Sequence, residues 1–136
     1  MHVLKAMSPN VHTIDPQASL VEIAQCMSDN NVGVLPVVED YKVVGLVTDR
    51  DIITRAIAQG ADPTTTTAAD VMTRDVQTVA DYQTVHDVEE LMRRKHIRRV
   101  VVLDRNNHPV GIVSLDDLAT RVSTNEAGQV LKQVCE

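Results

Sequence analysis

The sequence has no tryptophan, no phenylalanine and only two tyrosines, so aromatic side chains can neither fill a core nor stack on nucleic-acid bases. A net charge of −6 also disfavours a nucleic-acid partner, because phosphate-backbone binding needs a concentrated basic face. No apolar run approaches the roughly 20 residues that cross a membrane. The N-terminus lacks the apolar stretch of a secretory signal. We therefore expect a cytoplasmic protein with no nucleic-acid partner and no membrane partner.

Residues that commonly carry catalysis or bind metals are also scarce or badly spaced. Cys26 and Cys135 stand far apart without a CxxC spacing, which indicates two reduced thiols. The five histidines show no metal-ligand spacing, and no serine or cysteine stands in a recognisable nucleophile context. We expect no catalytic residue, no bound metal, no required cofactor and no enzymatic activity.

What is abundant is valine. The chain contains 23 valines, and β-branched residues favour buried, pleated strands. A chain of 136 residues can form one compact domain or two very small ones with a real core. The composition therefore favours an α/β (α+β) fold with an aliphatic core.

The sequence repeats itself once. A shift of 65 positions places Met7 on Met72, and a one-residue insertion in the turn after Asp104 changes the shift to 66, which places Gly45 on Gly111. We predict one unit at residues 1–62, a second at 68–125, and a tail at 126–136. The stretch GADPTTTT at 60–67 has the composition of a joint between them.

Each repeat predicts the order strand, helix, strand, strand, helix. In the first repeat, residues 11–14 alternate polar and apolar side chains, Ser19 precedes an amphipathic helix, and 32–39 and 43–48 are valine-rich strands. A second helix begins at Thr48 and ends at Gly60. Its spacing predicts an inner face made of Ile52, Ile53, Ala56 and Ile57. In the tail, Ala127, Val130, Leu131 and Val134 are again helically spaced.

The motifs GLVTDRD (45–51) and GIVSLDD (111–117) each place a hydroxyl residue three positions before an aspartate, between a strand and a helix. Thr48 with Asp51, and Ser114 with Asp117, therefore suit a helix cap. They also suit a nucleoside phosphate. Helix N–H groups and the hydroxyl would bind phosphate, the carboxylate would accept hydrogen bonds from a ribose diol, and the glycine would let a ligand approach the backbone. A single such motif favours the cap.

A basic run, RRKHIRR, occupies residues 93–99. Its first four residues suit the solvated C-terminus of a helix, where cations complement the helix dipole. Arg98 and Arg99 instead enter a strand that looks buried, so they call for a carboxylate or a ligand phosphate as partner, and phosphate is slightly favoured.

The two GhhS/TxxD motifs in register, the strand VGVLPVV, and the segments MSPNVHTI and MTRDVQTV together resemble a tandem pair of CBS domains, often called a Bateman module. The resemblance covers residues 3–123. It implies two units packed around a pseudo-two-fold axis with two clefts that bind an adenine derivative such as AMP, ADP, ATP or S-adenosylmethionine. It also implies a homodimer and a sensing role toward an unidentified effector protein, here as a free-standing CBS-pair protein.

The resemblance also suggests site residues. Phosphate and ribose would be bound by Ser114, Asp117, Arg98 and Arg99 in one cleft, and by Thr48 and Asp51 in the other. The base would lie near Ile14, Asp15, Leu20 and Gly33 in the first cleft, and near Val79, Ala80 and Val85 in the second. The chain departs from the common pattern at Val101, where the first repeat has Pro36.

Two functions remain open from the sequence. One is a regulatory module that binds an adenine ligand and passes the signal to a partner by a conformational change. The other is an interaction or scaffolding protein of the same fold that binds no nucleotide and uses its motif residues only as helix caps. The presence of both aspartates favours the first, because a cap can be made in other ways.

Overall fold

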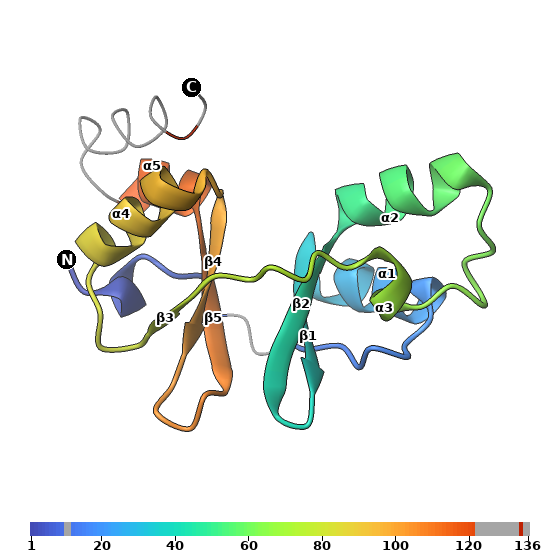
Figure 1. Ribbon diagram of the computed structural model, residues 1–136, viewed down its shortest axis with the longest axis horizontal. Helices are drawn as coiled ribbons and strands as arrows, with labels where there is room; N and C mark the ends of the chain where they lie inside the picture. The colour runs from blue at the N-terminus through green and yellow to red at the C-terminus, as the bar shows by residue number, and fades with distance from the viewer. Residues whose placement is uncertain (10–11, 122–133, 135–136) are drawn as a thin grey trace. The chain divides into compact units, whose positions relative to one another are not determined.

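The computed structural model describes residues 1–9, 12–121 and 134. The chain forms two compact units, whose helices and strands are labelled in Figure 1. The central unit is His12–Val76, and the terminal unit combines Met1–Val11 with Gln77–Glu136. Within the described residues, no helix is both long and apolar enough to cross a membrane.

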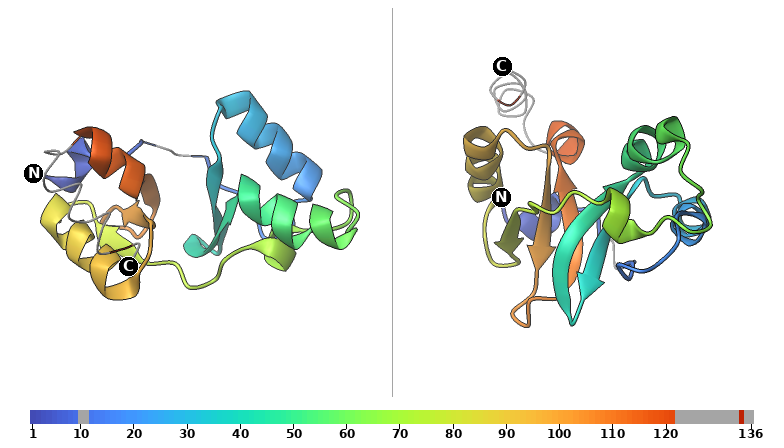
Figure 2. Two further views of the ribbon diagram at one scale, coloured as in Figure 1. Left: turned by 90° about the horizontal axis from the view of Figure 1, so that it is seen from above. Right: turned by 45° about the vertical axis from the view of Figure 1, so that its right-hand side comes forward.

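The central unit is a β-hairpin with helices on one face (Figures 1 and 2). Its elements are α1 (Leu20–Asn30), β1 (Val34–Glu39), β2 (Lys42–Thr48), α2 (Asp49–Arg55), the 3₁₀ turn η2 (Ile57–Gln59) and α3 (Ala68–Val71). As predicted, Ser19 caps α1, because its Oγ accepts a hydrogen bond from the Glu22 N–H at 3.2 Å. The segment predicted as a short strand or extended lead-in at 11–14 contributes one parallel bridge, Ile14 to Val37.

The terminal unit repeats this plan with one more strand. Its elements are the 3₁₀ turn η1 (Val3–Lys5), β3 (Thr78–Ala80), α4 (Val85–Lys95), β4 (Arg99–Leu103), β5 (Pro109–Ser114) and α5 (Leu115–Arg121). The sheet has the order β3-β4-β5, with β3 parallel and β5 antiparallel to β4. The predicted mixed α and β fold is confirmed, and the order strand, helix, strand, strand and helix is complete in the second repeat, whereas the opening strand of the first repeat is reduced to the single bridge at Ile14.

The two hairpins show where the repeats differ in length. Val38 pairs with Val43 around residues 39–42, and Leu103 pairs with Pro109 around residues 104–108. A register shift precedes each of these pairs at the same point of the strand. The second loop is longer by one residue, which is the insertion that the sequence predicts after Asp104.

Aliphatic side chains fill both cores. In the central unit, Leu35, Val37 and Val47 of the hairpin pack against α1 residues such as Leu20 and Ile23. In the terminal unit, the core includes Val100, Val102 and Val113 of the sheet with Val88, Met92 and Leu118 of the helices. Each unit thus has its own hydrophobic cluster built mainly from valine, leucine and isoleucine, as the composition predicts.

The predicted inner face of the second helix is partly wrong. Ile52 and Ala56 pack against the core of the central unit, but Ile53 is 60% exposed and Ile57 is 52% exposed. Ile52 and Ala56 are spaced i, i+4 along one face, whereas Ile53 lies one residue further around α2 (Asp49–Arg55) and Ile57 already belongs to the tighter turn η2. Ile53 and Ile57 therefore form an exposed aliphatic pair, which we call the α2 patch.

In the tail, Ala127, Val130 and Leu131 lie outside the described residues. Val134 is described, and its side chain is buried in the hydrophobic cluster of the terminal unit. At least this member of the apolar stripe is therefore used within the chain.

The compact units and the sequence repeats divide the chain differently, because each repeat donates its opening turn to the other repeat. We call residues 3–7 the first lead-in turn and residues 68–72 the second. The first packs in the terminal unit, where Val3 and Ala6 are fully buried, and the second packs in the central unit through Ala68 and Val71. The exchange joins residues 1–11 to the body of the second repeat.

Each lead-in turn packs directly against the glycine of a GhhS/TxxD motif. A Cβ added to Gly45 would lie 2.5 Å from the Met72 Sδ, and one added to Gly111 would lie 2.5 Å from the Met7 Sδ and 2.8 Å from the Ser8 carbonyl oxygen. The residue after each methionine pairs with the same strand, as Thr73 does with Leu46. The close approach of the lead-in methionine therefore accounts for the glycine in each motif.

We predict that Gly45→Ala destabilises the protein by about 1–3 kcal/mol, because the added methyl group collides with a buried side chain. In a Met72→Ala background the same substitution should cost clearly less, since most of the collision is removed. Denaturant unfolding of the four proteins of this cycle measures the coupling between the two sites. Additive effects would show that the methionine is not what requires the glycine.

Candidate functional site

At the junction of β5 and α5, Ser114 and Asp117 form a reciprocal cap. The Ser114 N–H donates to the Asp117 Oδ2 at 2.9 Å, and the Asp117 N–H donates to the Ser114 Oγ at 3.0 Å. The second carboxylate oxygen, Oδ1, accepts a hydrogen bond from the Ser8 hydroxyl at 3.3 Å. The cap uses a lone pair of the Ser114 hydroxyl, so its hydrogen can still be donated to another group.

The junction of β2 and α2 has the same geometry. The Thr48 N–H donates to the Asp51 Oδ2 at 3.0 Å, and the Asp51 N–H donates to the Thr48 Oγ1 at 3.0 Å. Here the Oδ1 faces the Arg55 Nε at 3.7 Å. The structural role that the sequence offered for these residues is therefore met in both units.

The backbone donors at these junctions are largely taken. In the central unit the Asp49 N–H donates to the Gly33 carbonyl at 3.0 Å, and the Arg50 N–H donates to the Asp49 Oδ1 at 2.8 Å. In the terminal unit the Leu115 N–H donates to the Arg98 carbonyl at 2.9 Å. The sequence hypothesis included phosphate binding by free N–H groups at the helix start. Few of these N–H groups are free, so side-chain cations would contribute more to phosphate binding.

Arg98 and Arg99 lie beside Ser114. Arg99 opens β4 and stands directly across the antiparallel ladder from Ser114, and Arg98 is tied to the first residue of α5 through its carbonyl. The expectation that both enter a buried strand is wrong, because both are exposed and burial begins only at Val100. The guanidinium groups therefore need no buried partner and are open to a ligand from solvent.

The central unit has no such cations at the equivalent positions. Val34 stands across from Thr48 as Arg99 stands across from Ser114, and Gly33 takes the place of Arg98. An acidic side chain lies there instead, since a Cβ on Gly33 would be 3.1 Å from the Asp49 Oδ2. The two junctions share a cap but differ in local charge, with exposed guanidinium groups beside Ser114 and the Asp49 carboxylate beside Gly33.

The residues predicted to lie near the base fall into two kinds. Leu20 and Val85 are buried at the starts of α1 and α4, and Ile14 and Val79 are buried with their backbones in sheet pairing. The remaining three are more open to solvent: Asp15 and Gly33 are exposed and Ala80 is half-buried. Ile14, Asp15, Leu20 and Gly33 belong to the central unit, and Val79, Ala80 and Val85 to the terminal unit.

Sequence reasoning missed two arginines. The Arg55 Nη1 donates to the carbonyls of Val71 at 3.0 Å and Met72 at 3.3 Å. Arg121, which is 66 positions later, binds the corresponding carbonyls of the other lead-in turn. Arg55 and Arg121 occupy equivalent positions of the two repeats, so their shared role could have been suspected from the sequence.

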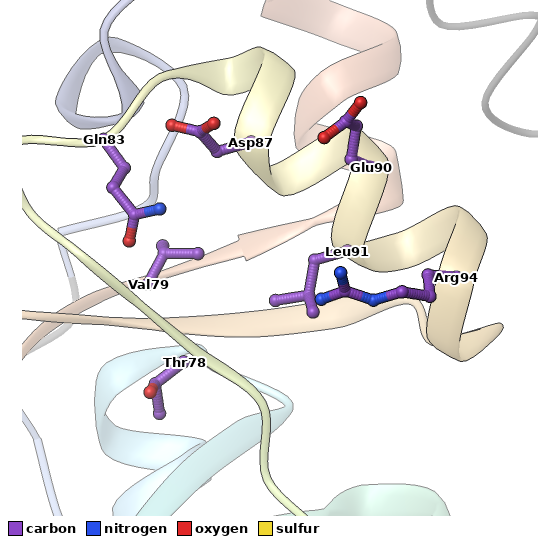
Figure 3. A pocket seen from close by; sticks show the side chains of 7 residues that line it. All are labelled: Thr78, Val79, Gln83, Asp87, Glu90, Leu91 and Arg94. Carbon is purple, nitrogen blue, oxygen red and sulfur yellow. The ribbon is translucent and has the colours of Figure 1, made fainter.

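A cavity of about 250 Å³ opens beside α4 in the terminal unit (Figure 3). It is lined by Thr78, Val79, Gln83, Asp87, Glu90, Leu91 and Arg94, so Val79 is its one residue from the predicted site. The Thr84 N–H donates to the Asp87 carboxylate and lowers its pKa, so this group is ionised at neutral pH. Two carboxylates against one guanidinium make this cavity a poor phosphate site.

No group of three His, Cys, Asp or Glu side chains capable of holding a metal ion is found within residues 1–9, 12–121 and 134.

The family model for the CBS domain matches residues 3–57 and 68–124, which is most of the chain and both repeats. The chain belongs to the CBS domain family. It carries two CBS domains in tandem, a Bateman module, and such pairs are regulatory modules. The resemblance seen in the sequence motifs is confirmed.

Several proteins and solved structures are similar to this chain. The CBS domain-containing protein YhcV of Bacillus subtilis is 38% identical over 97% of this chain and 94% of its own. The hexameric CBS-CP12 protein from bloom-forming cyanobacteria superposes with a TM-score of 0.80 at 26% identity, over 93% of this chain and 74% of that one. The CBS domain pair of MJ0100, solved with 5′-methylthioadenosine and S-adenosyl-L-methionine, gives a TM-score of 0.74 at 30% identity, over 88% and 98%.

Proposed function

We propose that this CBS pair is a sensor that binds an adenine nucleotide or related adenosyl compound and passes its occupancy to a partner protein without catalysing a reaction. The observation that carries the proposal is the group at the start of α5. A capped carboxylate, a hydroxyl with a free hydrogen and the exposed Arg98 and Arg99 are brought together there by the pairing of β4 with β5. The adenosyl ligands of MJ0100 support an adenine compound as the ligand class.

Each group has a defined role in this proposal. The guanidinium groups of Arg98 and Arg99 bind phosphate or another anionic group of the ligand, and the Ser114 hydroxyl donates to the same group. Asp117 accepts hydrogen bonds from the ribose diol, because a carboxylate has about four lone-pair positions and the cap uses only one or two.

A scaffolding protein of the same fold that binds no nucleotide is the second candidate. The completed caps favour it, because Ser114 with Asp117, and Thr48 with Asp51, each satisfy one another's hydrogen bonds without any ligand. Against it stand the two exposed arginines, which a cap does not require.

A thermal-melt screen separates these two functions. A ligand that binds only the folded state stabilises it by about 2.7 kcal/mol at 100 times Kd, so AMP, ADP, ATP or S-adenosylmethionine should raise Tm by several degrees. Guanosine monophosphate serves as the matched control for phosphate and ribose without adenine. If none of the adenine compounds moves Tm, the scaffolding function is the correct one.

The two clefts should bind unequally, with the tighter one built on Asp117. Charge-assisted hydrogen bonds contribute roughly 1.5–3 kcal/mol each, so the absence of both arginines from the other cleft should cost tenfold or more in affinity. In calorimetry, Asp117→Ala should abolish the tight phase and Asp51→Ala should leave it. The pair is matched, because both substitutions break the same kind of cap and should lower stability by a similar amount, about 1 kcal/mol. Loss of the tight phase in Asp51→Ala would reverse the assignment.

We also propose that the protein is a homodimer. The α2 patch, Ile53 and Ile57, is an exposed aliphatic surface on a helix, which a second copy would cover. Since the cyanobacterial relative is hexameric, assembly varies among CBS proteins and must be measured here. Light scattering at micromolar concentration should give the dimer mass, and Ile53→Glu should reduce it to the monomer mass. Tyr82→Glu, at another exposed hydrophobic residue, is the control; a monomeric wild type would refute the proposal.

A further inference from the structure

The carboxylate of Asp117 takes part in two separate contacts within the terminal unit. Its Oδ2 accepts the N–H of Ser114 at 2.9 Å and so belongs to the helix cap. Its Oδ1 accepts the hydroxyl of Ser8 at 3.3 Å. Asp117 and Ser8 are both half-buried, so only part of the carboxylate can be reached from solvent. Because the cap holds Oδ2, a ligand bound by Asp117 depends mainly on Oδ1, the oxygen that Ser8 already occupies.

The backbone of Ser8 is held independently of its hydroxyl. The Ser8 N–H donates to the Ile112 carbonyl at 2.9 Å, and the Ile112 N–H donates to the Ser8 carbonyl at 3.1 Å. Just before Ser8, the Met7 carbonyl accepts a hydrogen bond from the Arg121 Nη1 at 2.6 Å. Loss of the hydroxyl bond therefore leaves this segment paired with β5, and the hydroxyl can turn to water while the backbone stays in place.

The bond between Ser8 and Asp117 is long for its kind. A hydroxyl that donates to a carboxylate usually lies about 2.5–2.7 Å from it, and the bond weakens as the distance grows. A ribose diol offers two hydroxyls to the same carboxylate, on a ligand whose phosphate is held by Arg98 and Arg99 in the proposed function. Two hydroxyls on an anchored ligand can therefore replace one hydroxyl held at 3.3 Å.

The central unit is built differently at this point. The Asp51 Oδ1 faces the Nε of Arg55 at 3.7 Å. Thr73, which the 65-residue repeat makes equivalent to Ser8, pairs through its backbone with β2 as Ser8 pairs with β5. The corresponding carboxylate oxygen thus meets a hydroxyl in one unit and a guanidinium in the other, and Thr73 provides a matched control for Ser8.

We propose that Ser8 is a built-in competitor for the ribose site: its hydroxyl occupies the Asp117 carboxylate in the empty protein and gives way to the ribose diol of the ligand. The inference rests on the proposed function, in which Asp117 binds ribose, and adds a device that sets the affinity. The bond stabilises only the empty protein. By linkage, its removal must strengthen ligand binding by the same free energy that it takes from the stability of the empty protein.

The test measures binding of ribose 5-phosphate to the full chain by calorimetry, because this compound needs only the ribose and phosphate groups of the terminal unit. The site is identified by its loss in Asp117→Ala. Ser8→Ala should lower its dissociation constant about fivefold, which corresponds to one modest hydrogen bond. Thr73→Ala should leave the constant unchanged. Inorganic phosphate is the matched ligand: it does not use Asp117, so its affinity should be the same in Ser8→Ala as in the wild type.

Thermal unfolding gives an independent measurement. Without ligand, Ser8→Ala should have a lower Tm than the wild type, because its folded state lacks the bond. At saturating ribose 5-phosphate the two melting temperatures should converge, since neither folded protein then has the bond. A difference in Tm that persists at saturation would show that Ser8 and ribose bind Asp117 together, which overturns the inference.

The remaining outcomes are also decisive. A higher dissociation constant in Ser8→Ala would mean that the hydroxyl orients the carboxylate for the ligand, and a gain shared by inorganic phosphate would mean that the whole site has loosened; either result overturns the inference. A wild type that does not bind ribose 5-phosphate would instead show that the proposed function is wrong at Asp117, and the inference would fall with it. Should Ser8→Ala not fold, Ser8→Cys keeps a side chain of similar shape with a weaker donor, and a smaller gain in affinity is expected.

Discussion

The close contact between a lead-in methionine and a glycine of the neighbouring strand is the constraint on which both units depend. Because Gly45 and Gly111 have no side chain, the sulfur of Met72 or Met7 and the backbone that follows can lie directly on β2 or β5. This approach brings the carbonyls of the lead-in turn within reach of Arg55 or Arg121, and brings Ser8 to Asp117. A bulkier residue at either glycine would separate the capped junction from the segment that leads into the other unit.

The junction residues show how one set of side chains can serve both stability and recognition. A cap uses the lone pairs of a hydroxyl and one oxygen of a carboxylate, but it leaves the hydroxyl hydrogen and further lone pairs available. Capping and ligand binding are therefore compatible at Ser114 and Asp117. What distinguishes the two junctions is their surroundings: exposed guanidinium groups at 98 and 99, against Gly33, Val34 and the carboxylate of Asp49. The repeated motif therefore has the same structural role in both units but a different electrostatic environment in each.

Much of the fold could be predicted from the sequence because it follows from local patterns. The caps at Ser19 and Thr84, the valine-rich hairpins and the extra residue after Asp104 are all readable within a few positions. The exposure of Ile53 was not, because the spacing of four apolar residues does not say how wide a face of the short helix α2 the core covers. The exchange of lead-in turns was not either, since nothing local tells Val3 which of two similar sheets to join. In the candidate site, the caps and the position of Arg99 beside Ser114 were predictable, whereas the exposure of Arg99 and the hydrogen bonds from Arg55 and Arg121 to the lead-in turns depend on tertiary contacts.

The exchange of lead-in turns makes the two repeats depend on each other. A single repeat standing alone would have an uncovered glycine on its last strand and a lead-in turn with no sheet of its own to cover. Two separate copies of a repeat would have to exchange these turns, as a domain-swapped pair does. Because residues 60–67 join the repeats in one chain, the exchange is intramolecular and does not depend on protein concentration.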